Sequence, residues 1–283
     1  FRLGERTCIN EWGEYRIFDE ELSYHRKVQP IEGEQISIQQ AYQFPFPNVS
    51  DDSRFEGVET QVQSIHADQK AAVLFLEMTI FEKTWRMRGF ETFLMDMVAN
   101  PDLAEYLLDE VTRRSTAIAA RCAQTGVDII QFGDDVGAEK AMLMRPALWR
   151  RVLKPRLAEV IAAAKKANPD LLAFYHSDGF ITPVVPDLIE IGVDILNPIQ
   201  PEAVDIPFLK KEYGNHLSFW GGIGVQTTMP FGTPQEVRTA VADLIHQAGS
   251  GGGLVVSPSH VVEHDVPAQN IISFVESIRD YRP

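Results

Sequence analysis

The chain has very little cysteine, which limits how its fold can be stabilised. Its two cysteines, Cys8 and Cys122, lie far apart among 283 residues. A small secreted fold held by disulfides needs several cysteines, so we exclude that class and expect a reducing, cytoplasmic environment. Cys122 stands among alanines in a segment of helical pattern, where we expect a small buried hydrophobic side chain.

Long apolar runs and an excess of positive charge are also missing. The sequence has no run of about 18 apolar residues and no signal peptide, so we expect no membrane-spanning helix. With 26 basic and 40 acidic residues, the formal net charge is −14. We therefore expect no binding to nucleic acid or to an anionic membrane. The glycines at 251–253 precede an apolar run instead of following one, and no nucleotide-binding motif is present.

The length and composition of the chain fit one large globular domain. No linker composition and no internal repeat divides it, so we predict a single domain over 1–283. Residues 66–283 show β/α repeats, whereas 1–65 are irregular, with a strand or hairpin at 11–17 and a loop at 43–54. The chain begins with Phe instead of Met, and we expect its native N-terminus to be missing.

Short, continuously apolar runs alternate with helical patterns from about residue 70 onward. Such runs are typical of strands buried on both faces of a parallel sheet. Six runs are found, at 71–78, 127–132, 171–175, 193–196, 217–220 and 253–256. Helices are predicted at 100–126, with Asn100 as N-cap, at 146–168, with a kink at Pro155, at 182–191, at 233–248, with a capping box from Thr233 to Glu236, and at 268–279.

This alternation predicts a parallel sheet, either doubly wound or closed into a barrel. A closed (β/α)₈ barrel needs eight strands, and six are visible. Either residues 1–65 supply irregular barrel elements, or a strand was lost with the N-terminus. In both arrangements, ligands bind beyond the carboxyl ends of the strands.

Those strand ends are unusually polar, which predicts a site. His176 and Asp178 are the sharpest pair, because residues i and i+2 of extended backbone point to the same side. A His-x-Asp pair suits a divalent metal such as zinc, or a carboxylate that orients a histidine base; it is also compatible with a simple surface turn. His260, after the last run, is the candidate third ligand.

Further polar residues at the strand ends are candidates for catalysis and binding. Of the adjacent pair Asp134 and Asp135, one is expected to face the site, and Asp135 is the candidate for positioning substrate or acting as a base; the other would bind backbone amides or cap the next segment. Gly221 and Gly222 would allow a ligand or cofactor to approach the backbone. The other candidates are Asn197 and Gln200 for catalysis, and Glu77, Glu82 and Arg88 for substrate binding.

These residues lie within stretches that resemble a known family. The stretches are 81–97, 132–156, 174–179, 186–203, 219–238 and 257–271, and more weakly Glu11-Trp12-Gly13. Together they resemble the uroporphyrinogen decarboxylase superfamily and, within it, the branch of cobalamin-dependent methyltransferases. The resemblance implies a (β/α)₈ TIM barrel, so we expect an α/β fold of this kind with an incomplete N-terminal part. Barrels of this kind often pair, and a homodimer is expected.

The resemblance also implies a metal and a reaction. The methyltransferase branch binds zinc through His-x-Cys and a later Cys; here Asp178 stands in the first Cys position, and His260 falls close to the later one. Oxygen and nitrogen ligands leave a metal a stronger Lewis acid than thiolates do. This favours removal of a methyl group from a small methoxylated compound and its transfer to a corrinoid carried by a partner protein.

Two other functions remain open. The first is a metal-free decarboxylase-like lyase that holds an acid through Arg86, Arg88 or Arg145. The second is a barrel that only binds a small molecule or a corrinoid partner.

Overall fold

A computed structural model of the chain describes residues 7–19, 24–33, 36–76 and 78–281. These residues form two compact units that alternate along the chain. The first contains the described residues of Phe1–Ala72, Met78–Val127 and Pro155–Pro169, and the second contains those of Val73–Glu77, Asp128–Lys154 and Asp170–Pro283. The chain passes between them several times, which sequence composition cannot reveal because no linker marks the crossings. The single domain over 1–283 stays a prediction.

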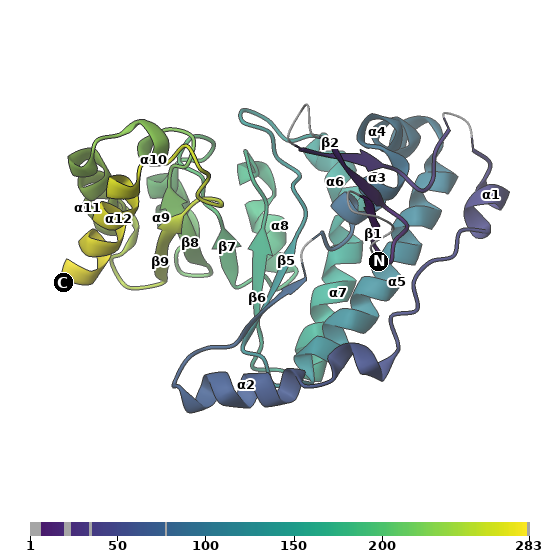
Figure 1. Cartoon of the computed structure of the whole chain (residues 1–283), viewed down its shortest axis with the longest axis horizontal. Coiled ribbons are helices and arrows are strands. Elements are labelled where there is room, and N and C mark those ends of the chain that lie inside the picture. Colours follow the sequence, from purple (N-terminus) through teal and green to yellow (C-terminus); the bar gives the residue numbers. More distant parts are fainter. Residues whose placement is uncertain (1–6, 20–23, 34–35, 77, 282–283) are drawn as a thin grey trace. The chain divides into compact units, whose positions relative to one another are not determined.

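The second unit is built on a parallel sheet with strand order β4-β5-β6-β7-β8-β9 (Figure 1). All six predicted strands are confirmed. Their bounds are Val73–Leu76 (β4), Ile129–Gly133 (β5), Leu172–His176 (β6), Ile195–Asn197 (β7), Ser218–Ile223 (β8) and Leu254–Pro258 (β9). β5 is buried along its whole length, as expected for a strand covered on both faces. The six parallel strands and the helices between them confirm the predicted α/β fold. Among the described residues β4 and β9 lie at the edges of this sheet, so its closure into an eight-stranded barrel stays a prediction.

Helices of the second unit follow the strands in turn. They are α6 (Pro146–Val152), α8 (Val185–Glu190), α9 (Ile206–Tyr213), α10 (Thr228–Phe231), α11 (Pro234–Ala248) and α12 (Ala268–Asp280), with a short 3₁₀ turn at Thr182–Val184. The predicted capping box is present at the start of α11, where the Thr233 hydroxyl accepts from the Glu236 N–H, and the Glu236 carboxylate accepts from the Thr233 N–H. α11 packs on β8 and β9 and against α9 and α12.

A buried carboxylate connects α6 to α8. Asp187 accepts hydrogen bonds from Arg150 Nε at 2.9 Å and from Lys154 Nζ at 2.7 Å. Burial by itself would raise the pKa of Asp187, but these two cations outweigh it and hold the pKa below its ordinary value. Asp187 is therefore ionised at neutral pH and contributes to stability there.

The first unit contains an antiparallel sheet, β1 (Thr7–Ile9), β2 (Tyr15–Asp19) and β3 (Tyr24–Val28), in the order β1-β2-β3. The predicted hairpin is confirmed, although 11–14 form its turn and not a strand. This small sheet is separate from the parallel one, so the described part of 1–65 supplies no strand to it. The predicted loop at 43–54 is largely irregular, with a 3₁₀ turn at Asp52–Phe55.

The helices of the first unit are α1 (Ile38–Tyr42), α2 (Val58–Ala67), α3 (Phe81–Arg88), α4 (Phe90–Ala99), α5 (Pro101–Ala123) and α7 (Lys154–Ala167, whose first residue counts with the other unit). The helix predicted at 146–168 is interrupted at Leu153, beside Pro155, into α6 and α7. Asn100 precedes α5 as expected, but its side chain makes no capping hydrogen bond. α1, α2, α3 and α4 were not predicted. In α3 and α4 the buried polar residues Arg88 and Asp96 interrupt the apolar pattern.

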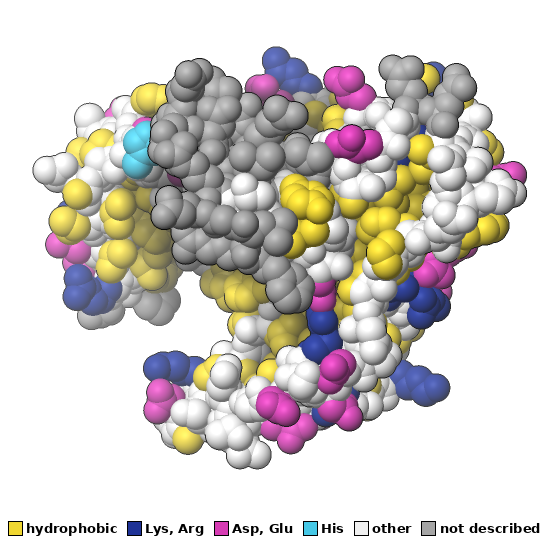
Figure 2. Space-filling view, turned by 45° about the vertical axis from the view of Figure 1, so that its right-hand side comes forward, with side chains coloured by type: hydrophobic (Ala, Val, Ile, Leu, Met, Phe, Trp, Pro, Cys, Tyr) yellow, Lys and Arg dark blue, Asp and Glu magenta, His cyan; other side chains and the backbone are white. Residues whose placement is uncertain are grey.

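The surface carries the mixed charge that the composition suggests. Figure 2 shows acidic and basic side chains interspersed over the face in view. Among the described residues, no helix is long and apolar enough to cross a membrane.

Candidate metal centre

Three neighbouring strands end in register in the second unit, which brings polar side chains together. Gly133 of β5 lies opposite His176 of β6, and His176 lies opposite Asn197 of β7. At the far side of the sheet, β9 ends at Pro258, and Ser259 donates its N–H to the Ile223 carbonyl at 2.8 Å. The residues that follow these strands therefore lie at the same end of the sheet, where the parallel strands have their carboxyl ends.

The structure brings together the three residues expected to bind metal. His176 Nε2 lies 3.8 Å from Asp178 Oδ1, and His260 Nε2 lies 3.7 Å from Asp178 Oδ2. One possible ligand atom from each residue lies within 4.8 Å of the other two. Asp178 thus stands between the imidazoles, as the i and i+2 spacing of the His-x-Asp pair suggests. Two imidazoles and a carboxylate are ligands that zinc accepts.

The environment of Asp178 suits a bound cation. Asp178 Oδ1 is buried and has no hydrogen-bond partner among the described residues. Burial raises the pKa of Asp178, and the nearby Asp135 carboxylate raises it further, against the opposing effect of His176 and His260. A buried carboxylate oxygen without a partner is unfavourable, and coordination of a cation removes that penalty. On this test, the residues fit a metal ion.

Asp135 is the member of the Asp134–Asp135 pair that faces this cluster. Its Oδ1 lies 3.7 Å from His176 Nε2 and accepts the N–H of Asp178 at 2.8 Å. Asp135 therefore also positions the backbone of a candidate ligand. Asp134 is buried, and its carbonyl accepts a hydrogen bond from the Tyr175 hydroxyl.

Asn197 and Gln200 contact the same loop through their amide groups. Asn197 Oδ1 lies 2.5 Å from His176 Nδ1, and its Nδ2 donates to the Trp220 carbonyl at 2.9 Å. Gln200 Oε1 accepts the N–H of Gly179 at 3.3 Å. Both amides thus hold the segment that carries His176 and Asp178.

Gly221 and Gly222 are required by the packing of the chain itself, and their role beside a ligand stays a prediction. A Cβ at Gly221 would collide with the Pro198 carbonyl oxygen, and the backbone there has φ +129°. A Cβ at Gly222 would lie 2.7 Å from two carbons of Leu244 in α11. Protein atoms therefore occupy the space that these glycines leave open.

Arg88 is also a structural residue and not an available anion holder. It is 2% exposed, and its Nε binds Asp96 Oδ2 at 2.7 Å. Its Nη1 donates to the carbonyls of Gly33, at 2.5 Å, and Ile31, at 3.3 Å. The guanidinium is thus used inside the first unit, which the sequence could not reveal because Asp96 lies in a helix that was not predicted.

The remaining candidates lie elsewhere. Glu82 belongs to the first unit, where its carboxylate lies 3.8 Å from Arg86. Arg86 is also 3.8 Å from the buried Glu14. Arg145 is exposed and precedes α6 in the second unit. Glu77 lies outside the described residues.

Several residues that support the site were missed. Ser177 is buried, and its hydroxyl accepts the N–H of Val136, which connects the loops that follow β5 and β6. A Cβ at Gly137 would lie 2.5 Å from the Asp178 carbonyl, so these loops touch backbone to backbone. The short side chains in Gly133–Gly137 and Ser177–Gly179 are the only sequence signal of this contact.

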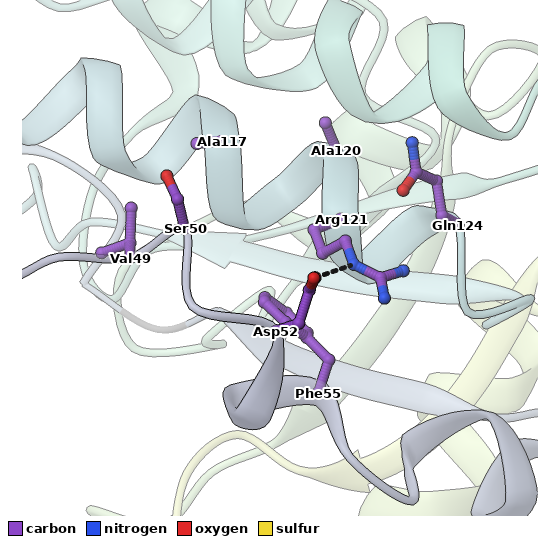
Figure 3. A pocket seen from close by; sticks show the side chains of 8 residues that line it. All are labelled: Val49, Ser50, Asp52, Phe55, Ala117, Ala120, Arg121 and Gln124. Carbon is purple, nitrogen blue, oxygen red and sulfur yellow. Dashed lines mark ion pairs between the residues drawn. The ribbon is translucent and has the colours of Figure 1, made fainter.

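A cavity of about 280 Å³ lies in the first unit. The residues that line it are Val49, Ser50, Asp52, Phe55, Ala117, Ala120, Arg121 and Gln124. Figure 3 shows Arg121 facing Asp52 across it, with Nε and Oδ1 3.6 Å apart. Its lining contains one ion pair and no histidine. We favour the cluster of His176, Asp178 and His260 as the site, because titratable side chains that converge indicate a functional site better than the volume of a cavity does.

A family model and curated relatives that match this chain carry the same description. The family model for uroporphyrinogen decarboxylase (URO-D) matches residues 78–281. A uroporphyrinogen decarboxylase of Coxiella burnetii is 21% identical over 197 residues, which is 69% of this chain and 52% of that protein. One from Chlorobaculum tepidum is 23% identical over 187 residues, 65% of this chain and 51% of that protein. The chain spans about half the length of these curated relatives.

A solved structure described as a methyltransferase from Methanosarcina mazei has a similar fold. Its TM-score is 0.70 with 18% sequence identity, over 96% of this chain and 78% of that one. At this identity, the likeness concerns the fold.

Proposed function

Because this chain belongs to the uroporphyrinogen decarboxylase family, we propose that it is a metal-dependent methyltransferase of that family. It takes a methyl group from a small methoxylated compound and passes it to a corrinoid carried by a partner protein. The observation that carries the proposal is the convergence of His176, Asp178 and His260, with the buried oxygen of Asp178 lacking a hydrogen-bond partner among the described residues. The fold shared with a protein described as a methyltransferase supports it.

The ligand set favours polarisation of a methyl ether over activation of a thiol acceptor. His176, Asp178 and His260 would hold zinc through two nitrogens and an oxygen, without the thiolates of the methyltransferase branch that the sequence resembles. Zinc bound in this way would supply a Lewis acid that polarises the oxygen of a methyl ether. Asp135, 3.7 Å from His176 Nε2, would bind the substrate beside the ligands.

The proposed reaction balances without an oxidant. The bond between the methyl carbon and the ether oxygen would break, and the methyl group would pass to the corrinoid partner, whose reduced cobalt would supply both electrons of the new bond. The oxygen leaves with the bonding electrons and takes a proton from water. The product is the free hydroxyl compound.

A decarboxylase-like lyase is the second candidate, because both curated relatives described above are uroporphyrinogen decarboxylases. In that case, Asp135 and His176 polarise a carboxylic acid without a metal. Arg88 cannot hold the acid, since Asp96 and two backbone carbonyls occupy its guanidinium. Of the three candidate arginines, the exposed Arg145 is the one that belongs to the second unit.

Metal analysis combined with two activity assays tests the proposal. We expect about one zinc per chain in the purified protein, lost in His176→Ala and retained in His216→Ala, whose histidine is exposed and outside the cluster. We also expect methyl transfer from a panel of methoxylated compounds to cobalamin, abolished in His176→Ala. A metal-free protein that decarboxylates uroporphyrinogen would establish the second candidate instead. Binding of a corrinoid protein without turnover of either substrate class would indicate a binding-only role.

A further inference from the structure

We propose that Asn197 is a positioning residue that selects the tautomer of His176, so that the proton sits on Nδ1 and Nε2 presents a lone pair to the site. The inference deepens the metal centre proposed above and rests on it for its function. It concerns a hydrogen-bonded chain through three adjacent strands, from Trp220 of β8 through Asn197 of β7 to His176 of β6.

The orientation of the Asn197 amide is determined by its partner on β8. Asn197 Nδ2 donates to the Trp220 carbonyl at 2.9 Å. A backbone carbonyl can only accept, so the amide group must present its NH₂ there. Rotating the amide by half a turn would place Oδ1 against the carbonyl oxygen, which loses the hydrogen bond and adds repulsion. Oδ1 is therefore the atom that faces His176.

The sheet holds this amide in place. Asn197 and His176 are register partners of the parallel pair β6 and β7. The Asn197 carbonyl also accepts the N–H of Ser177 at 3.1 Å. The two side chains are thus presented from neighbouring backbone positions, and their 2.5 Å contact follows from the register.

The proton on His176 follows from the amide orientation. An amide oxygen only accepts, so His176 Nδ1 must carry the hydrogen that joins it to Asn197 Oδ1. In the neutral ring, the lone pair then lies on Nε2. Nε2 is the nitrogen near Asp178 Oδ1, at 3.8 Å, and Asp135 Oδ1, at 3.7 Å.

In this tautomer, Nε2 of His176 can coordinate a metal without first losing a proton. A metal ligand must offer a lone pair, and a histidine with its proton on Nε2 would have to exchange it first. Metal-binding histidines commonly donate their other N–H to a carboxylate or carbonyl, which fixes the ring and its tautomer. Here a side-chain amide does this, and a second carbonyl orients the amide in turn.

Two substitutions separate this role from simple packing. Asn197→Leu has a similar size and removes both hydrogen bonds. Asn197→Asp keeps an acceptor toward His176 but loses the donor to the Trp220 carbonyl. Asn168→Leu is the matched control, because Asn168 also donates its amide to a carbonyl, that of Val127, and belongs to the other unit.

The first measurement needs no metal. In the metal-free protein, ring ¹⁵N chemical shifts of His176, assigned by their loss in His176→Ala, should report the Nδ1–H form. This form should persist in Asn197→Asp and Asn168→Leu and give way to a mixture with the Nε2–H form in Asn197→Leu. A wild-type His176 with its proton on Nε2 would overturn the inference, even if Asn197→Leu failed to fold.

The second measurement is zinc affinity by competition with a chelator. We expect about tenfold to a hundredfold weaker binding in Asn197→Leu, in line with the loss of such supporting groups elsewhere, and wild-type affinity in Asn168→Leu. Asn197→Asp should bind more tightly than Asn197→Leu, because it keeps an acceptor toward His176 Nδ1. Equal affinity of Asn197→Leu and wild type overturns the inference and leaves the metal centre intact. A wild-type protein that binds no zinc refutes the metal centre, while the ¹⁵N shifts still decide the role of Asn197.

Discussion

Replacing Arg88 by methionine should destabilise the protein severely. The side chains of Arg88 and Asp96 are 1% and 7% exposed, and their ion pair measures 2.7 Å. The substitution leaves the Asp96 carboxylate buried without its cation, and two backbone carbonyls lose a donor. Breaking a buried pair in this way costs about 3–5 kcal/mol, a large part of the roughly 5–15 kcal/mol by which a folded protein is stable.

Urea denaturation followed by circular dichroism measures this cost. With a slope of about 3 kcal/mol/M, the transition midpoint should fall by roughly 1–1.7 M. Arg113→Met is the control, because the Arg113 side chain is 64% exposed beside Glu110 and such surface pairs contribute about 0–1 kcal/mol. The double variant Arg88→Met/Asp96→Leu should recover much of the loss, since it leaves no unpaired buried charge.

One result would refute this reasoning. If Arg88→Met keeps the wild-type midpoint while KM for a carboxylate-bearing substrate rises, then Arg88 binds substrate and is not a structural residue. That outcome would favour the decarboxylase-like candidate.

Three further predictions concern packing, thiol reactivity and pH. Gly221→Ala should cost about 3 kcal/mol in urea denaturation, because its Cβ would collide with the Pro198 carbonyl at a backbone φ of +129°; a wild-type midpoint would contradict this. Burial raises the pKa of the Cys122 thiol to about 11, so iodoacetamide at about pH 8 should modify the half-buried Cys8 and spare Cys122 until urea is added; equal labelling of both thiols in the folded protein would count against it. Since the pKa of Asp187 is lowered by folding, its contribution is present above the ordinary value of 3.8 and is lost as pH falls through the folded pKa. The difference in midpoint between the wild type and Asp187→Asn should therefore narrow from about pH 6 to about pH 3, and a constant difference would argue against the ion pairs as its cause.

The site was predictable to the extent that it depends on local geometry. The His-x-Asp spacing and the position of His260 after the last apolar run were enough to select three residues that the fold brings within 4.8 Å of one another. The functions of Arg88 and of Gly221 could not be predicted. Each depends on a partner that is distant in space or in sequence, Asp96 in an unpredicted helix and Pro198 on a neighbouring segment.

The sequence by itself determined where the strands lie along the chain, the end of the strands where polar side chains gather, and the candidate ligands. It could do so because strand burial and side-chain direction repeat over two residues of local backbone. Only the tertiary structure decided which acid of the Asp134–Asp135 pair faces His176, and that Asn197 reaches both His176 and Trp220. These contacts depend on the register between strands that are separated in the chain, and that register is seen only once the strands are paired in the sheet.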